Sequence, residues 1–94
     1  MIGLDVWVLR TVCEQAPGVL DDARDFGGTS IYADAVGVLS QQALPPGVRA
    51  AVTDLQRTLE GDWEGRDEAH ERVILALREE YRRVNAFLAR GGRS

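Results

Sequence analysis

The feature that most constrains this chain is a run of 25 residues, 66–90, that contains neither glycine nor proline. Its apolar residues recur every three or four positions, which is the spacing of an amphipathic helix with one face against a core. At about 1.5 Å per residue such a helix would be roughly 37 Å long, so we expect the other helices to pack against it. The main stripe consists of Val73, Leu77, Tyr81, Val84 and Leu88, flanked by Ala69, Ile74, Ala76 and Phe87.

A second helix is predicted directly before this one, over residues 48–60. Its apolar stripe consists of Val48, Ala51, Val52, Leu55 and Leu59. Residues 61–65 then connect the two helices, and a link this short makes an antiparallel helical hairpin. The sequence therefore predicts an all-α fold, a small bundle of four to five helices built on this C-terminal hairpin.

The first half of the chain predicts two or three further helices. Residues 4–15 are apolar on nearly every side, which suits a covered helix but also a strand. We favour a helix because the sequence offers no convincing second strand. Pro17 is expected to end this element and to begin another over residues 18–26, which a pair of glycines separates from a helix over residues 31–43. The inward-facing residues are predicted to be Val19, Leu20, Ala23 and Phe26 in the former, and Ile31, Ala35, Val38 and Leu39 in the latter.

Length, charge and cysteine content narrow the class of protein. The 94 residues are expected to form one helical domain, residues 1–90, with a flexible tail at 91–94. A net charge of −4 argues against a nucleic-acid partner. Cys13 has no second cysteine to pair with, and no signal peptide or long apolar run is evident, so we expect a cytoplasmic protein without a membrane partner. All 11 basic residues are arginine, which indicates a GC-rich bacterial genome.

The usual signatures of catalysis and cofactor binding are missing from the sequence. It has no phosphate-binding glycine loop, Cys-x-x-Cys pair or His-Glu-x-x-His motif, so we predict no catalytic residue, no metal and no cofactor. Two polar residues nevertheless share the apolar side of the long helix. Glu80 must reach water or pair with Arg10, Arg49 or Tyr32.

The second of these polar residues, His70, is expected to be half-exposed in the first turn of the helix. A small enzyme that uses Glu80 or His70 is an alternative interpretation. The two residues would lie about 15 Å apart along one helix, which is too far for them to act together on one small group.

The strongest candidate for a binding site is the acid-rich link before the long helix, together with that helix's first turns. An aromatic residue surrounded by acids is typical of a hot spot for a basic protein partner. The same pattern would also arise if Trp63 closed the end of the hairpin core. The predicted partner-binding residues are Asp62, Trp63, Glu64, Asp67, Glu68 and Glu71, and the predicted function is that of a protein-binding module.

The first element carries more apolar surface than one small core needs, which predicts a homodimer. The residues expected at the dimer contact are Val6, Trp7, Leu9 and Cys13. A structural subunit whose only partner is itself is therefore the alternative to a module that binds another protein.

The order of these features also resembles a known group of proteins. The residues concerned are Leu9, Val12, Ala16, Pro17, Gly27, Gly28, Tyr32, Leu55, Leu59, Gly61 and Asp62, followed by a final helix. This arrangement is similar to that of small bacterial helical proteins, some of which occur in settings that suggest toxin immunity. The resemblance implies a protein-binding role, such as that of an immunity protein, antitoxin or regulator that occludes a basic surface, and it assigns no catalytic residue.

Overall fold

The computed structural model describes residues 4–91, and within that range the chain forms four α-helices and no strand. The helices are α1 (Leu4–Phe26), α2 (Gly28–Ser40), α3 (Pro46–Glu60) and α4 (Arg66–Ala89). The predicted all-α bundle is therefore confirmed. Residues 1–3, and residues 92–94 of the predicted tail, lie outside the described part of the chain.

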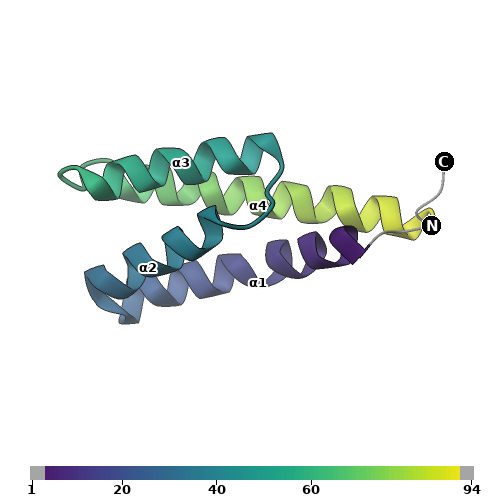
Figure 1. Ribbon diagram of the computed structural model, residues 1–94, viewed down its shortest axis with the longest axis horizontal. Coiled ribbons are helices and arrows are strands. Elements are labelled where there is room, and N and C mark those ends of the chain that lie inside the picture. The colour runs from purple at the N-terminus through teal and green to yellow at the C-terminus, as the bar shows by residue number, and fades with distance from the viewer. Residues whose placement is uncertain (1–3, 92–94) are drawn as a thin grey trace.

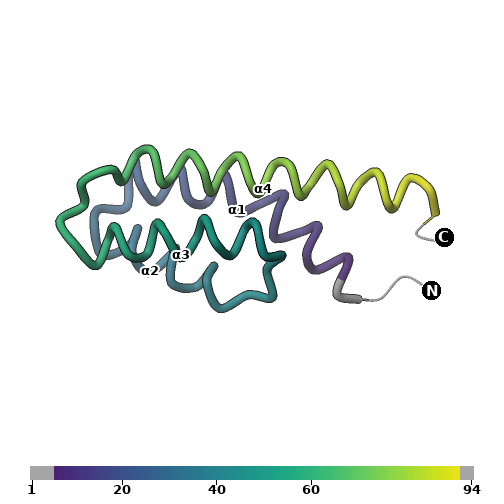
Figure 2. Tube along the Cα trace, turned by 90° about the horizontal axis from the view of Figure 1, so that it is seen from above, coloured from purple at the N-terminus to yellow at the C-terminus, as the bar shows by residue number. Residues whose placement is uncertain are grey.

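The four helices form an elongated bundle that measures 46 × 21 × 18 Å (Figure 1). Each helix packs against two others: α1 lies against α2 and α4, and α3 lies against α2 and α4. The α1–α2 and α3–α4 connections lie at one end of the bundle, which we call the turn end. The start of α1 and the end of α4 lie at the opposite end, the terminal end, where both helices extend past the α2–α3 linker (Figures 1 and 2).

Helix α1 has 23 residues and continues through Pro17, so the predicted break there is wrong and residues 4–15 are helical. A proline inside a helix removes the hydrogen bond to the carbonyl four residues earlier, here that of Cys13, and costs about 3 kcal/mol or more. Cys13 and Leu20, on either side of the proline, are both buried in the core. Burial of apolar side chains before and after the proline stabilises the continuous helix against this cost.

The core confirms the predicted stripes of the two C-terminal helices. Val48, Val52 and Leu55 of α3 are buried, as are Val73, Leu77 and Val84 of α4. The last turn of α4 departs from the pattern, because Phe87 is exposed where α4 extends past α3. A single apolar stripe with charged residues outside it therefore located the buried face of each helix.

The predicted inward faces of the first half are only partly right. Leu20 and Ala23 of α1 are buried as predicted, whereas Val19 and Phe26 are exposed. In α2 the predicted stripe is rotated by about one residue, or 100°. Leu39 is buried as predicted, but Ile31 and Val38 are exposed, and the buried partners of Leu39 are Tyr32 and Val36.

Candidate functional site

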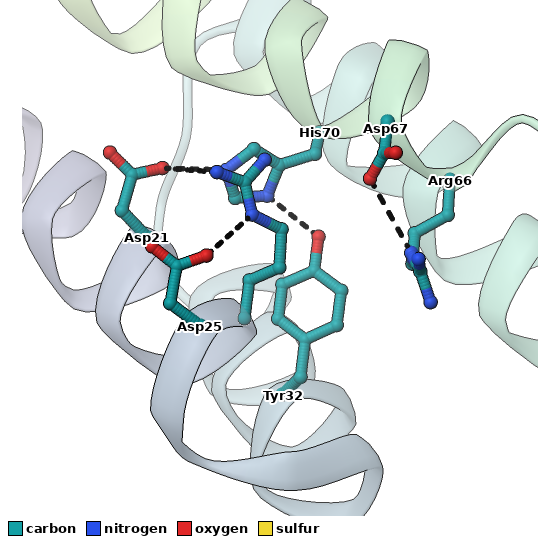
Figure 3. A network of polar contacts seen from close by, with 7 residues as sticks. Asp21, Asp25, Tyr32, Arg66, Asp67 and His70 are labelled. Carbon is teal, nitrogen blue, oxygen red and sulfur yellow. Dashed lines mark hydrogen bonds and ion pairs between the residues drawn. The ribbon is translucent and has the colours of Figure 1, made fainter.

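A buried polar network joins three helices near the turn end (Figure 3). His70 of α4 is fully buried, with 0% of its surface exposed, so the expected half-exposed state is wrong. Its Nε2 lies 2.8 Å from Oδ1 of Asp21 in α1, and its Nδ1 lies 2.7 Å from the Tyr32 hydroxyl in α2. The ring is buried because α1 packs against α4 and the Tyr32 side chain reaches the ring from α2.

The network uses both nitrogens of the His70 ring. The Asp21 carboxylate accepts the Nε2 proton, and in the neutral ring Nδ1 accepts the Tyr32 hydroxyl proton. Burial raises the pKa of Tyr32 to about 12, so the hydroxyl keeps its proton at neutral pH. Each buried polar group is therefore satisfied by a neighbour on another helix, and neither ring nitrogen is free to bind a ligand. Within residues 4–91, no group of three or more histidine, cysteine or acidic residues is placed to hold a metal ion.

Arg24 connects this network to the acids at the surface. Its Nε donates to Asp25 Oδ1 at 3.3 Å, and one of its terminal nitrogens lies 3.9 Å from Asp21. Burial favours a lower pKa for Arg24, but the hydrogen bond to Asp25 and the charges of Asp25, Asp21 and Asp67 outweigh it and raise the pKa. The acids of α1 and the first acids of α4 therefore share one electrostatic environment.

The predicted partner-binding acids all lie exposed at the turn end. Asp62 and Glu64 belong to the α3–α4 connection, and Asp67, Glu68 and Glu71 belong to the first two turns of α4. In the connection, Asp62 accepts a hydrogen bond from the Glu64 backbone at 3.1 Å. The other four carboxylates point away from the core with only weak ion pairing, so this surface remains strongly negative.

Trp63 has a different environment from the acids around it. Its backbone adopts a left-handed φ of 67°, and its indole nitrogen donates to the Leu59 carbonyl at 2.8 Å. The half-buried ring packs against the core, with its centroid 6.2 Å from that of Tyr32, and the Arg66 guanidinium lies 5.3 Å above its centroid. Trp63 therefore closes this end of the core and offers only part of its ring to a partner.

An aromatic residue at the same end was predicted to be buried but is exposed. Phe26, the last residue of α1, is 85% exposed and follows directly after the exposed Asp25. Its position in the sequence predicted burial, because it falls on the same helical face as Ala23. The α1 helix ends there, however, and Gly27 turns the chain into α2 so closely that no helix covers the ring.

Glu80 is separate from this site. Its carboxylate is mostly buried and lies 3.2 Å from Arg83, one turn further along α4. The predicted partners are engaged elsewhere: Arg10 donates to Asn85 at 2.7 Å, Arg49 donates to backbone carbonyls, and Tyr32 reaches His70. The proposed pairings of Glu80 with these three residues are therefore wrong.

The four residues predicted to mediate self-association do not share one surface. Trp7 is exposed, with the Arg10 guanidinium 5.8 Å from its ring centroid, and Val6 and Leu9 are half-buried. Cys13 is 2% exposed and lies in the core. Its burial, and then the charge of Glu80, raise the pKa of the Cys13 thiol to about 11.

Comparison with protein-family models, curated proteins and solved structures found no match to this chain. None of the helices in residues 4–91 combines the length and the apolar character that crossing a bilayer requires.

Proposed function

We propose that this protein is a non-catalytic binding module that holds the basic surface of another protein against its turn end. The half of the bundle at that end, residues 17–33 and 54–74, contains ten acids and four arginines. The other half, residues 4–16, 34–53 and 75–91, contains five acids and six arginines. The negative charge of the molecule is therefore concentrated at one end, where it would steer a basic partner.

The observation that carries this proposal is the meeting of two acidic segments beside an exposed aromatic ring. Asp22 and Asp25 come from the end of α1, whereas Asp67 and Glu68 come from the start of α4. Phe26 directly follows Asp25 and is exposed, and the charge of Asp67 reaches Arg24 between these α1 acids. Protein interfaces combine an aromatic anchor with charged groups around it, and this end of the bundle offers both.

The buried network supports a binding role over a catalytic one. His70 is sealed between Asp21 and Tyr32, and it remains ten residues from Glu80 along α4. A general acid or base must reach its substrate, and the His70 ring has no exposed atom with which to do so. In this proposal the network instead fixes the relative positions of α1, α2 and α4, and thus the acids that they carry.

Within this proposal the protein acts in the bacterial cytoplasm, in the manner of an immunity protein, antitoxin or regulator. The partner would be a basic protein whose nucleic-acid-binding or other functional face is blocked by occupation. We further propose that the α3–α4 hairpin is the unit on which the bundle is built, because α3 and α4 pack along their predicted stripes.

Capture of partners from the native organism, or of the product of the neighbouring gene, tests the binding role. We expect a basic protein to be recovered and its affinity to fall steeply with salt. The double change Asp62→Lys and Glu68→Lys should abolish capture while the helical circular dichroism signal is retained.

A matched double change, Asp34→Lys and Glu79→Lys, alters the charge equally at exposed positions outside the turn end and should leave capture intact. Recovery of no basic partner, or binding that survives both high salt and the Asp62→Lys and Glu68→Lys changes, would refute the proposal.

A further inference from the structure

The exposed large apolar residues of this molecule gather on two of its four helices. Of the eight such residues in the described chain, six belong to α1 and α2, none belongs to α3, and two belong to α4. Val19 of α1 and Val38 of α2 are 56% and 60% exposed, although each helix also contributes a separate buried face to the core. The α1–α2 pair therefore has a second apolar face that the bundle itself does not cover.

This outer face is grooved. One hollow of about 260 Å³ runs between α1 and α2, with Val12, Ala16 and Val19 on one side and Ala35, Val38 and Leu39 on the other. A second hollow of about 280 Å³ continues it toward the terminal end, and the two share Val12 and Gln42. From Val6 to Val19 the resulting groove is about 20 Å long, which is the length of a 13-residue helix such as α2.

The lining of this groove distinguishes it from the rest of the surface. Gln15 and Gln42 are its polar side chains, and no charged residue lines either hollow. The hollows along α4, by contrast, are lined by charged residues. Two of them contain Glu80 and Arg83, and a third contains Asp67 and Glu68. Depletion of charge with retention of apolar surface is the pattern of the buried centre of a protein interface.

The charge distribution selects the occupant. Two copies of a chain with net charge −4 repel each other, and a patch without charge is where they can meet at the least electrostatic cost. Charge is also distributed unevenly along the long axis of the molecule, because the turn end is strongly acidic and the terminal half has a small excess of arginine. An antiparallel pair would place the acidic end of each copy beside the arginine-rich half of the other.

We propose that a second copy of this chain covers the α1–α2 groove, and that the protein is an antiparallel two-fold dimer through this face. Val38 and Val19 of each copy form the ridge that enters the groove of the other, as ridges and grooves do when helices pack. Of the residues predicted at the contact, Val6 and Leu9 line this groove, whereas Trp7 and Cys13 do not, so the proposed surface extends from Val6 and Leu9 along the outer α1–α2 face. Both turn ends stay uncovered, so the dimer presents two acidic ends.

Sedimentation velocity over a series of protein concentrations tests the dimer. The unaltered chain should sediment with twice the mass of a monomer at high micromolar concentration. Val19→Glu with Val38→Glu should weaken self-association by roughly a hundredfold or more, because each contact would then bury unpaired carboxylates. Both side chains are exposed within one bundle, so the helical circular dichroism signal should be unchanged.

The matched control is Leu75→Glu. Leu75 of α4 is 61% exposed, as much as Val38, but its helical neighbours are the charged Glu71, Arg72, Arg78 and Glu79. This variant should remain a dimer. A monomeric unaltered chain at high micromolar concentration, or dissociation by Leu75→Glu as strong as that by the double change, would overturn the proposal.

A second measurement does not depend on the folding of the glutamate variants. Gln15 lines the groove near the middle of α1, so Gln15→Cys should be joined to its copy by a short bis-maleimide reagent, whereas Arg78→Cys on the outside of α4 should not. Cys13 contributes no background because its thiol is buried. Equal cross-linking of the two variants would refute the interface. Asp62 and Glu68 lie outside the groove lining, so Asp62→Lys with Glu68→Lys should weaken self-association far less than Val19→Glu with Val38→Glu does, and this test and that of partner capture fail independently.

Discussion

The α3–α4 pair and the α1–α2 pair bury their apolar residues in different ways. In α3 and α4 the apolar residues form one buried stripe with charged residues opposite, and the large apolar residues that are exposed are Leu75 and Phe87 of α4. In α1 and α2 apolar residues occupy two sides, of which one is buried and the other exposed. Periodicity identifies the buried face of a helix that has one apolar face, but it does not rank two such faces on the same helix.

Leucine-to-alanine changes in the α3–α4 pair should give the largest loss of stability. They test whether each of these helices buries one apolar face. Leu77 and Leu55 are almost completely buried, so Leu77→Ala and Leu55→Ala should each lower the free energy of unfolding by roughly 2–5 kcal/mol. Leu75→Ala, two residues away but exposed, should change it by less than about 0.5 kcal/mol. Chemical-denaturation midpoints measure all three. A ranking in which Leu75→Ala is the most destabilising would show that the buried face of α4 is misplaced.

The stability of the protein at alkaline pH tests the burial of Tyr32 and Cys13 on the inner face of the α1–α2 pair. Burial raises the pKa of Tyr32 from 10.0 to about 12, so between these values the unfolded chain loses a proton that the folded chain keeps. The unfolded state then binds fewer protons, and the stability present below pH 10 falls as pH rises, by about 1–3 kcal/mol at pH 12. The raised pKa of Cys13, from 9.0 to about 11, adds a similar loss that begins one pH unit lower.

Urea denaturation from pH 8 to pH 12 measures this loss. Tyr32→Phe lowers stability at neutral pH, because it leaves Nδ1 of His70 without its partner. It should also remove the Tyr32 part of the decline above pH 10. An unchanged decline in this variant would mean that the Tyr32 hydroxyl ionises as readily in the folded chain as in the unfolded one.

Gly37→Ala on the outer side of α2 should give the smallest effect, and its sign is informative. A methyl group at Gly37 meets no atom within 4 Å, so alanine should stabilise the helix by up to about 1 kcal/mol. Gly28→Ala should have the opposite effect. Gly28 has a φ of +76°, which a residue with a side chain adopts only with strain, so this substitution should lower the stability of the protein. Thermal denaturation of the monomeric Val19→Glu, Val38→Glu background separates these local effects from dimer formation. A loss of stability in Gly37→Ala there would contradict the open space around this residue.

Local sequence patterns predicted the helical class and the buried faces of α3 and α4, and non-local contacts explain what they missed. The register of α2 follows from Tyr32, whose hydroxyl reaches His70 38 positions later in the chain. The burial of His70 follows from Asp21, 49 positions earlier. The continuity of α1 through Pro17 depends on core partners from other helices. Periodicity describes one helix at a time, and these features require several helices to be assembled.

In the candidate site, the exposure of the acids could be predicted from the sequence. A dense run of carboxylates on a polar link has too few partners to be buried, so these side chains stay in solvent. The role of Trp63 remained open between anchor and plug, and its packing against Tyr32 favours the plug. Phe26 gave one signal that sequence reading could have used. It is the last residue before two glycines, and a helix that ends there cannot be relied on to cover its final side chain.

The placement of the α1–α2 and α3–α4 connections at the turn end has a practical consequence for handling this molecule. The first turn of α1 and the last turn of α4 lie at the far end of a bundle 46 Å long (Figure 1). In the monomeric Val19→Glu, Val38→Glu variant, a biotin, fluorophore or resin linker joined through either of these turns would leave the acidic end facing the solution. Immobilised in that orientation, the chain is suited to surface-based binding assays, and a fluorophore placed there would report rotation of the whole particle without touching the captured protein.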